Sequence, residues 1–230
     1  MKAAMKGVEA GEAGGPPASW AERAADRSPV LQQRRSRNMR QIEAMVEAAK
    51  RLILRNGAGF TTQEVAREAG VAQQTFYRYF KGKDQLLLAV MEDLHATNAG
   101  LFEEAARDLP GPLARLRYYI GAALETLDTA NPAMRPAQYI TAEHWRLHQL
   151  YPEEMVRVGQ PVTELFARQL RAASEQGLIT SSDPDRAAEM MVMLVRAVYH
   201  HYAFQDRSEP TAAIADRVWE MCLRGIGGRL

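Results

Sequence analysis

The sequence of 230 residues contains a single cysteine, Cys222, and no long apolar run. One cysteine excludes an intramolecular disulfide and fits a reducing cytoplasm. A membrane-spanning helix needs roughly 18–20 consecutive apolar residues, and no run approaches that length. The N-terminus carries Lys2 and Lys6, but Glu9, glycines and prolines follow in place of an apolar segment, so we expect no secretory signal. We therefore expect a cytoplasmic protein without a membrane partner.

The sequence also lacks the patterns that mark catalytic and cofactor sites. It contains no nucleophile elbow, phosphate-binding loop, dinucleotide fingerprint or set of cysteine ligands. His144 and His148 have the i, i+4 spacing that can place two imidazoles on one metal, but no acidic residue stands at zinc-ligand spacing. His200 and His201 are adjacent, so they face apart on a helix. We therefore expect no enzyme activity, no cofactor and no metal site.

Charge is distributed unevenly along the chain, although the net charge is only +1. Residues 31–90 hold eleven Lys/Arg against five Asp/Glu, whereas residues 91–230 hold fourteen against nineteen. A local excess of positive charge is either an ordinary solvated face or the electrostatic footprint of a polyanion-binding surface. The motif inside residues 31–90 favours the second interpretation.

That motif runs from Phe60 to Leu86 and predicts two short helices joined by a tight turn. Thr61 and Glu64 have capping-box spacing, which starts a helix near residue 62. Gly70 ends this helix because glycine tolerates a left-handed conformation at the C-terminal cap. A second helix follows within a few residues, over about 73–80, as a helix-turn-helix requires.

The second helix has an apolar side and a side of hydrogen-bonding groups. Phe76 and Phe80 lie four residues apart and are expected to point inward. Glutamine can address adenine edges, arginine can address guanine or phosphate, and tyrosine can reach a phosphate. The groups expected to face outward are Gln73, Gln74, Arg78 and Tyr77. This helix therefore resembles a recognition helix for a duplex groove.

The run AGVAQQTFYRYFKGKDQLL, residues 69–87, is similar to the signature of the TetR (tetracycline-repressor-like) family of bacterial transcription regulators. The resemblance covers about residues 40–90. One departure is Ala72, where the family often has a serine cap, so the helix loses about 0.5–2 kcal/mol of local stability. The resemblance implies an all-α fold with an N-terminal three-helix helix-turn-helix DNA-binding domain and a C-terminal helical domain for ligand binding and dimerisation.

We expect three segments: a mobile tail at 1–33, a DNA-binding domain at 34–83, and an effector-binding and dimerisation domain at 84–230. The basic cluster at 34–40 stands just ahead of a first helix expected over 38–56. It is either an arm that follows the phosphate backbone or an adjacent minor groove, or a solvated basic patch. Later helices are expected over about 84–107, 112–130, 137–150, a segment ending near 176, 184–205 and 211–225. Pro161 should kink or split the helix that contains it.

The resemblance assigns candidate DNA contacts by position in the motif. Gln73 and Gln74 are expected to read base edges, with Gln63 as a further reader from the preceding helix. The residues expected mainly to hold phosphates are Thr62, Thr75, Tyr77, Tyr79 and Lys83. The remaining candidates are Arg78, which can address guanine or phosphate, and Arg37 of the basic cluster.

The C-terminal part offers polar and aromatic residues on otherwise apolar helices, a composition typical of small-molecule pockets. Each of these residues, taken singly, also fits an ordinary core. The resemblance implies that some of them line a pocket for a mostly apolar effector. The candidates are Tyr118, Tyr119, Tyr139, His144, Trp145, His148, Met155, Met190, Met193, Tyr199 and His200.

The last two helices carry apolar surface for a partner. The stretch 190–199 is apolar nearly all round, and the final helix offers a stripe of Ile214, Val218, Trp219, Cys222 and Leu223. In the family these helices pair between subunits, which implies a homodimer that reads a pseudo-palindromic operator. The alternative is that both stripes close a core within one chain.

The function expected from the sequence is therefore a DNA-binding transcriptional repressor released by a small effector. The alternative is a small-molecule-binding helical protein without specific operator binding, for which Ala72 is the supporting feature.

Overall fold

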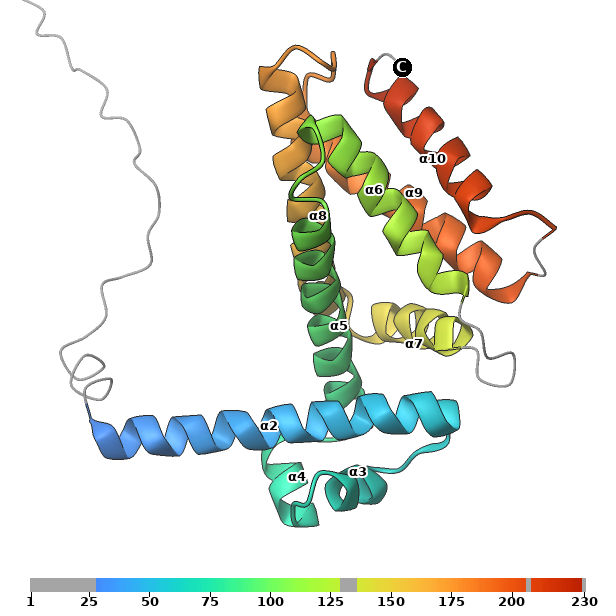
Figure 1. Cartoon of the computed structure of the whole chain (residues 1–230). Coiled ribbons are helices and arrows are strands. Elements are labelled where there is room, and N and C mark those ends of the chain that lie inside the picture. The colour runs from blue at the N-terminus through green and yellow to red at the C-terminus, as the bar shows by residue number, and fades with distance from the viewer. Residues whose placement is uncertain (1–27, 129–135, 206–207, 229–230) are drawn as a thin grey trace, which may run out of the picture. The chain divides into compact units, whose positions relative to one another are not determined.

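The computed structural model describes residues 28–128, 136–205 and 208–228, and within these ranges every regular element is a helix (Figure 1). The all-helical fold class expected from the sequence is confirmed for this part of the chain. The chain divides into two compact units, residues 1–43 and residues 44–230. Among the described helices, none has both the length and the apolar character that crossing a bilayer requires.

The first described helix, α2 (Pro29–Asn56), begins well before the expected start at residue 38. Proline suits a first helical turn because its missing N–H would have no partner there, and the Gln32 amide donates to the Ser28 carbonyl at 3.0 Å. The leucine, glutamine and arginine residues that follow are good helix formers. The basic cluster therefore lies on a helix and not on an extended arm. Residues 1–27 of the expected tail lie outside the described residues.

The helix-turn-helix has the expected boundaries. After η1 (Gly57–Gly59), helix α3 (Thr62–Glu68) begins with a complete capping box. The Thr61 hydroxyl accepts from the Glu64 amide at 3.2 Å, while the Glu64 carboxylate accepts from the Thr61 amide at 2.7 Å. Gly70 has a φ of 67°, which permits the turn before α4 (Gln73–Tyr79).

A small apolar core holds these short helices together. Phe76 is fully buried, Phe80 is 7% exposed, and their ring centroids lie 5.6 Å apart. Val65 on α3 and Met45 on α2 are also fully buried. Because helices of this length are marginal alone, this packing fixes the angle at which α4 presents its outer face.

The remaining helices form a bundle with one extensive core. In Figure 1, α5 and α8 lie side by side, and α6 lies between α8 and α10. The elements are α5 (Lys83–Ala105), α6 (Gly111–Glu125), η2 (Thr126–Asp128), α7 (Pro136–Leu150), α8 (Pro152–Glu175), α9 (Pro184–Phe204) and α10 (Thr211–Gly225).

The structure also differs from the sequence-based expectations within the bundle. The helix expected over 112–130 ends at Glu125 and continues as the 3₁₀ turn η2, and residues 129–135 lie outside the described ranges. Pro161 does not split its helix, because α8 runs through it without interruption, and a kink at this residue stays a prediction. Val158 and Phe166, on either side of the proline, are both buried in the bundle, so tertiary packing holds the two halves in one helix.

The apolar stripe of α10 is buried within the chain and not displayed for a partner. Trp219 is 5% exposed and Leu223 is 2% exposed, because this face of α10 packs on α6. Of the two alternatives considered for this stripe, the structure shows the intrachain core. On α9, by contrast, Met190 and Met193 remain 56% and 48% exposed.

Candidate functional site

The outer face of α4 presents an array of polar side chains. Gln73 and Gln74, in its first turn, and Arg78, in its last, are exposed, while Thr75 is half-buried. Ala72 occupies the N-cap with extended backbone angles but supplies no side-chain hydrogen bond. The two glutamines therefore stand at the exposed N-terminal end of α4, where donors and acceptors can reach a groove.

Side chains of α3 extend this polar surface. The hydroxyls of Thr62 and Tyr77 lie 3.2 Å apart, which joins the two helices at the surface. Gln63 is exposed in the first turn of α3. The Arg78 guanidinium lies 4.8 Å from the centroid of the Tyr79 ring. The structure thus brings together the expected contacts of α3 and α4, whereas Arg37 lies exposed on the part of α2 that belongs to residues 1–43.

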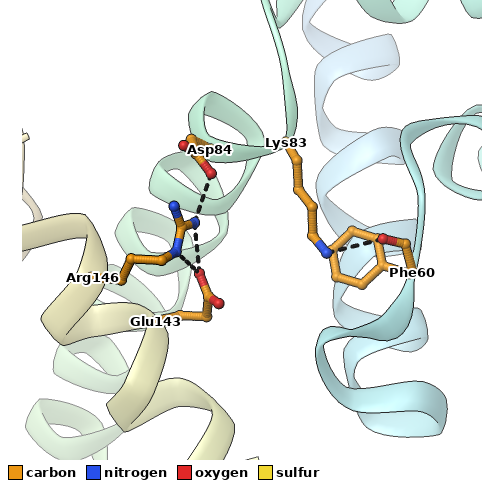
Figure 2. A network of polar contacts seen from close by, with 5 residues as sticks. All are labelled: Phe60, Lys83, Asp84, Glu143 and Arg146. Carbon is orange, nitrogen blue, oxygen red and sulfur yellow. Dashed lines mark hydrogen bonds and ion pairs between the residues drawn. The ribbon is translucent and has the colours of Figure 1, made fainter. Parts of the chain in front are cut away.

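Lys83 is engaged inside the helix-turn-helix. Its Nζ donates to the Phe60 carbonyl at 2.9 Å and lies 4.0 Å from the centroid of the Phe60 ring (Figure 2). Burial lowers the pKa of this lysine. A phosphate contact by Lys83 stays a prediction.

An ion-pair network ties α7 to the first turn of α5, as Figure 2 shows. We call Asp84, Glu143 and Arg146 the α5–α7 latch. The Arg146 guanidinium donates to Asp84 at 2.6 Å and to Glu143 at 2.8 and 2.9 Å. The bond from Arg146 lowers the pKa of Asp84. The latch therefore fixes the start of α5, one residue beyond Lys83, to a helix of the bundle.

A cavity of about 350 Å³ lies among α5, α6, η2, α7, α8 and α9. This volume falls within the range of roughly 300–1,000 Å³ typical of small-molecule sites. Helix α5 lines it at i, i+3, i+4, i+7 and i+11 with Met91, Leu94, His95, Asn98 and Phe102. One face of α5 therefore forms one wall of the cavity.

Helix α9 forms the facing wall at a similar spacing, with Val192, Val195, Arg196, Tyr199 and His200. Helix α7 contributes Ile140 and His144, and α8 contributes Val162 and Phe166. The walls are mostly apolar, with a few polar groups that converge on the interior.

Three imidazoles meet at this cavity. The His144 ring centroid lies 5.3 Å from that of His200 and 6.3 Å from that of His95. Burial, followed by the positive charge of Arg196, lowers the pKa of His95 to about 4 and that of His144 to about 3. The same two causes lower the pKa of His200. These histidines are therefore neutral at pH 7, and within the described ranges no cluster of side chains fits a metal ion.

Of the eleven expected ligand contacts, His144, Tyr199 and His200 line the cavity. Tyr119 and Met155 are instead buried outside this lining. Tyr139 is half-buried and also outside it. Those on the surface are Tyr118, Trp145, His148, Met190 and Met193.

The lining residues that the sequence did not single out include the polar groups His95 and Asn98 of α5 and Arg196 of α9. Two signals were available in the sequence. His95 lies in the middle of a mostly apolar helix, and Arg196 is the single charge within the apolar stretch 190–199.

Comparison with known proteins shows that the helix-turn-helix segment of this chain matches a protein family. Residues 45–90 match the family of bacterial regulatory proteins described as the tetR family. An uncharacterized HTH-type transcriptional regulator of Bacillus subtilis, YvkB, is 25% identical over 79% of this chain and 95% of its own length. The HTH-type transcriptional repressor DhaR of Mycobacterium sp. is 24% identical over 78% of this chain and 90% of its own.

Solved structures extend the fold match beyond the helix-turn-helix. FadR of Thermus thermophilus, a TetR-family repressor solved with lauroyl-CoA, superposes with a TM-score of 0.66. The two chains are 19% identical, and the match covers 82% of this chain and 96% of that one. At this identity the comparison shows a common fold.

Proposed function

The chain belongs to the tetR family of bacterial transcriptional regulators, and on this premise we propose that it is a repressor that binds a pseudo-palindromic operator as a homodimer and is released by a small, mostly apolar effector. Members of this family are regulators and not enzymes. The proposal rests on one observation: the same chain has an exposed polar face on α4 and a separate, mostly apolar cavity.

The proposed DNA contact places α4 in the major groove. Gln73 and Gln74 read base edges, and the hydroxyls of Thr62 and Tyr77 hold phosphates. Hydrogen bonds to base edges select the sequence, whereas phosphate contacts set register and affinity. The capping box of α3 and the buried Phe76 support this role because they fix the orientation of α4.

The proposed dimer forms through the last two helices, by way of their exposed faces. On α9 the exposed residues Met190, Met193, Ala197, His201 and Phe204 recur at helical spacing, and Met221 on α10 is 59% exposed. An exposed apolar stripe of this kind is typical of an interaction surface. A two-fold dimer presents two copies of α4 to successive half-sites.

The proposed effector site is the cavity between α5 and α9. Its apolar walls favour a mostly apolar molecule, and its few polar groups orient it. The FadR of Thermus thermophilus was solved with lauroyl-CoA, which supports small-molecule control in this fold. For this chain, the chemistry of the proposed effector is inferred from the residues that line its own cavity.

Coupling between the two sites is proposed to run through α5 and α7. Helix α7 contributes His144 to the cavity, and further along α7 Arg146 donates to Asp84 of α5 and to Glu143 of its own helix. A ligand that binds better when α7 is displaced weakens this latch at the base of the helix-turn-helix. By linkage, DNA then lowers ligand affinity by the same factor as ligand lowers DNA affinity.

The test is selection of duplexes from a random pool with wild-type protein and two variants. Gln73→Ala removes a proposed base contact, whereas Gln176→Ala truncates an exposed glutamine at the end of α8. We expect wild type and Gln176→Ala to select the same two-fold site, and Gln73→Ala to lose preference at one position of each half-site, by about 1–3 kcal/mol. An unchanged selection by Gln73→Ala would contradict the assignment.

A second candidate is a helical small-molecule-binding protein without a specific operator, and the uncapped Ala72 is the observation in its favour. Failure of the wild-type protein to enrich any sequence from the pool would support this candidate.

A further inference from the structure

Among the described side chains that line the cavity, Arg196 is the one charged residue. It lies midway along α9, within an apolar stretch, and its burial lowers the pKa of its guanidinium. Within the described ranges, its side chain has no hydrogen bond and no carboxylate in ion-pair range. Arg196 is half-buried, and partial removal of its charge from water costs free energy that a paired anion would offset.

The structure also makes room for this guanidinium. Gly159 on α8 lies against it, and a methyl group added at Gly159 would come within 3.2 Å of the Arg196 Nη2. Glycine inside a helix costs about 0.5–1 kcal/mol relative to alanine, and Gly159 is buried in the middle of α8. The Arg196 guanidinium therefore packs close to the backbone of α8 at this position.

The net charge of the cavity walls matches a ligand that carries one negative charge. His95, His144 and His200 are neutral at pH 7, so Arg196 contributes a net charge of about +1 to the walls. One carboxylate neutralises that charge, and its two oxygens fit the arginine fork. A phosphate group with two negative charges would leave one of them buried and unpaired.

We propose that the effector is an organic acid with a single carboxylate, which pairs with the Arg196 guanidinium while its apolar body lies against Met91, Phe102 and Phe166. This inference rests on the proposed function and narrows it from a mostly apolar effector to an amphipathic monoanion. The neutral imidazoles and Asn98 complete the hydrogen bonds around the carboxylate.

The test measures binding of matched acids and amides to the full-length protein by isothermal titration calorimetry. The probes are octanoate and 4-phenylbutyrate, each paired with its primary amide, which has the same shape without the charge. The variants are Arg196→Met, which removes the charge from the cavity, and Arg157→Met, the same change at an exposed position of α8.

We expect wild type and Arg157→Met to bind at least one acid about tenfold to a hundredfold more tightly than its amide, as a charge-assisted pair implies. In Arg196→Met this preference disappears, and the ligand-free variant melts at a higher temperature because an unpaired, half-buried charge has been removed. A preference retained in Arg196→Met, or no acid bound by wild type, would overturn the proposal.

Arg196→Lys provides a second test, which also applies if Arg196→Met does not fold. Lysine keeps the charge but not the fork, so the preference for the acid should remain while acid affinity falls. Undiminished acid affinity would overturn the pairing. DNA binding by ligand-free protein is measured alongside. If the protein binds DNA specifically but does not prefer the acid, this inference alone is rejected. If it prefers the acid but does not bind DNA specifically, the proposed repressor function is rejected.

Discussion

Helix α4 has no side-chain hydrogen bond at its N-cap, Ala72. We therefore predict that Ala72→Ser stabilises α4. The Ala72 backbone already has N-cap geometry, with φ −67° and ψ 147°. Its carbonyl accepts from the Thr75 amide at 2.8 Å and from the Phe76 amide at 3.2 Å. A serine hydroxyl at this position can accept from an amide of the first turn without any change in the backbone.

The magnitude follows from the value of such caps, about 0.5–2 kcal/mol. Amide hydrogen exchange measures it locally, and protection of the last turn of α4 should rise about twofold to thirtyfold. Because α4 has only seven residues, one cap is a large share of its local stability.

The control is Thr61→Ala, which removes the existing cap of α3. This change should lower protection in α3 by a similar factor, since the Thr61 hydroxyl accepts from the Glu64 amide. Unchanged exchange in α4 of Ala72→Ser, alongside faster exchange in α3 of Thr61→Ala, would refute the reasoning.

Three further predictions follow from the structure. The pKa values of His95 and His144, about 4 and about 3, lie below the unfolded value near 6.5, so the folded state binds fewer protons. The free energy of unfolding is therefore highest above pH 6.5 and falls as pH drops from about 6.5 to 4, by up to about 1.4 kcal/mol per pH unit for each imidazole; urea titrations should show a shallower dependence in His144→Gln. Arg146→Met should lower thermal stability modestly, because the pair with Asp84 is half-exposed whereas Glu143, which is 15% exposed, loses its partner; anisotropy titrations should show that ligand no longer weakens DNA binding. Phe76→Ala removes a fully buried side chain and should lower the free energy of unfolding of the helix-turn-helix by about 3–5 kcal/mol. Thermal melting followed by circular dichroism should show that the helices α5–α10 stay folded while the helix-turn-helix unfolds.

The helix-turn-helix could be predicted closely because its signals are local. Thr61 and Glu64 define the start of α3 by spacing alone, and Gly70 marks the turn by its conformational freedom. The four-residue separation of Phe76 and Phe80 indicates which face of α4 is buried. None of these inferences requires knowledge of distant contacts.

The cavity could not be predicted in the same way, because it depends on which face of each helix meets the bundle. Met190 and Met193 lie on the same helix as Val192 and Arg196, yet the methionines are exposed while the other two line the cavity. A stretch that is apolar nearly all round gives no periodicity from which to choose the inner face. Tertiary packing alone makes that choice.

The start of α2 was missed for a related reason. Its apolar stripe begins near Ile42, and the preceding turns are polar and largely exposed. Periodicity therefore marks only the packed half of α2, while helix propensity extends it to Pro29.

Sequence-specific DNA binding is the central property proposed for this protein, and fluorescence anisotropy tests it. Wild-type protein is titrated against the duplex upstream of its own gene and against a scrambled duplex of equal composition, at two salt concentrations. We expect tight binding to the native duplex that persists at moderate salt and much weaker, salt-sensitive binding to the scrambled one. Equal and equally salt-sensitive binding to both would contradict a repressor that acts at its own promoter.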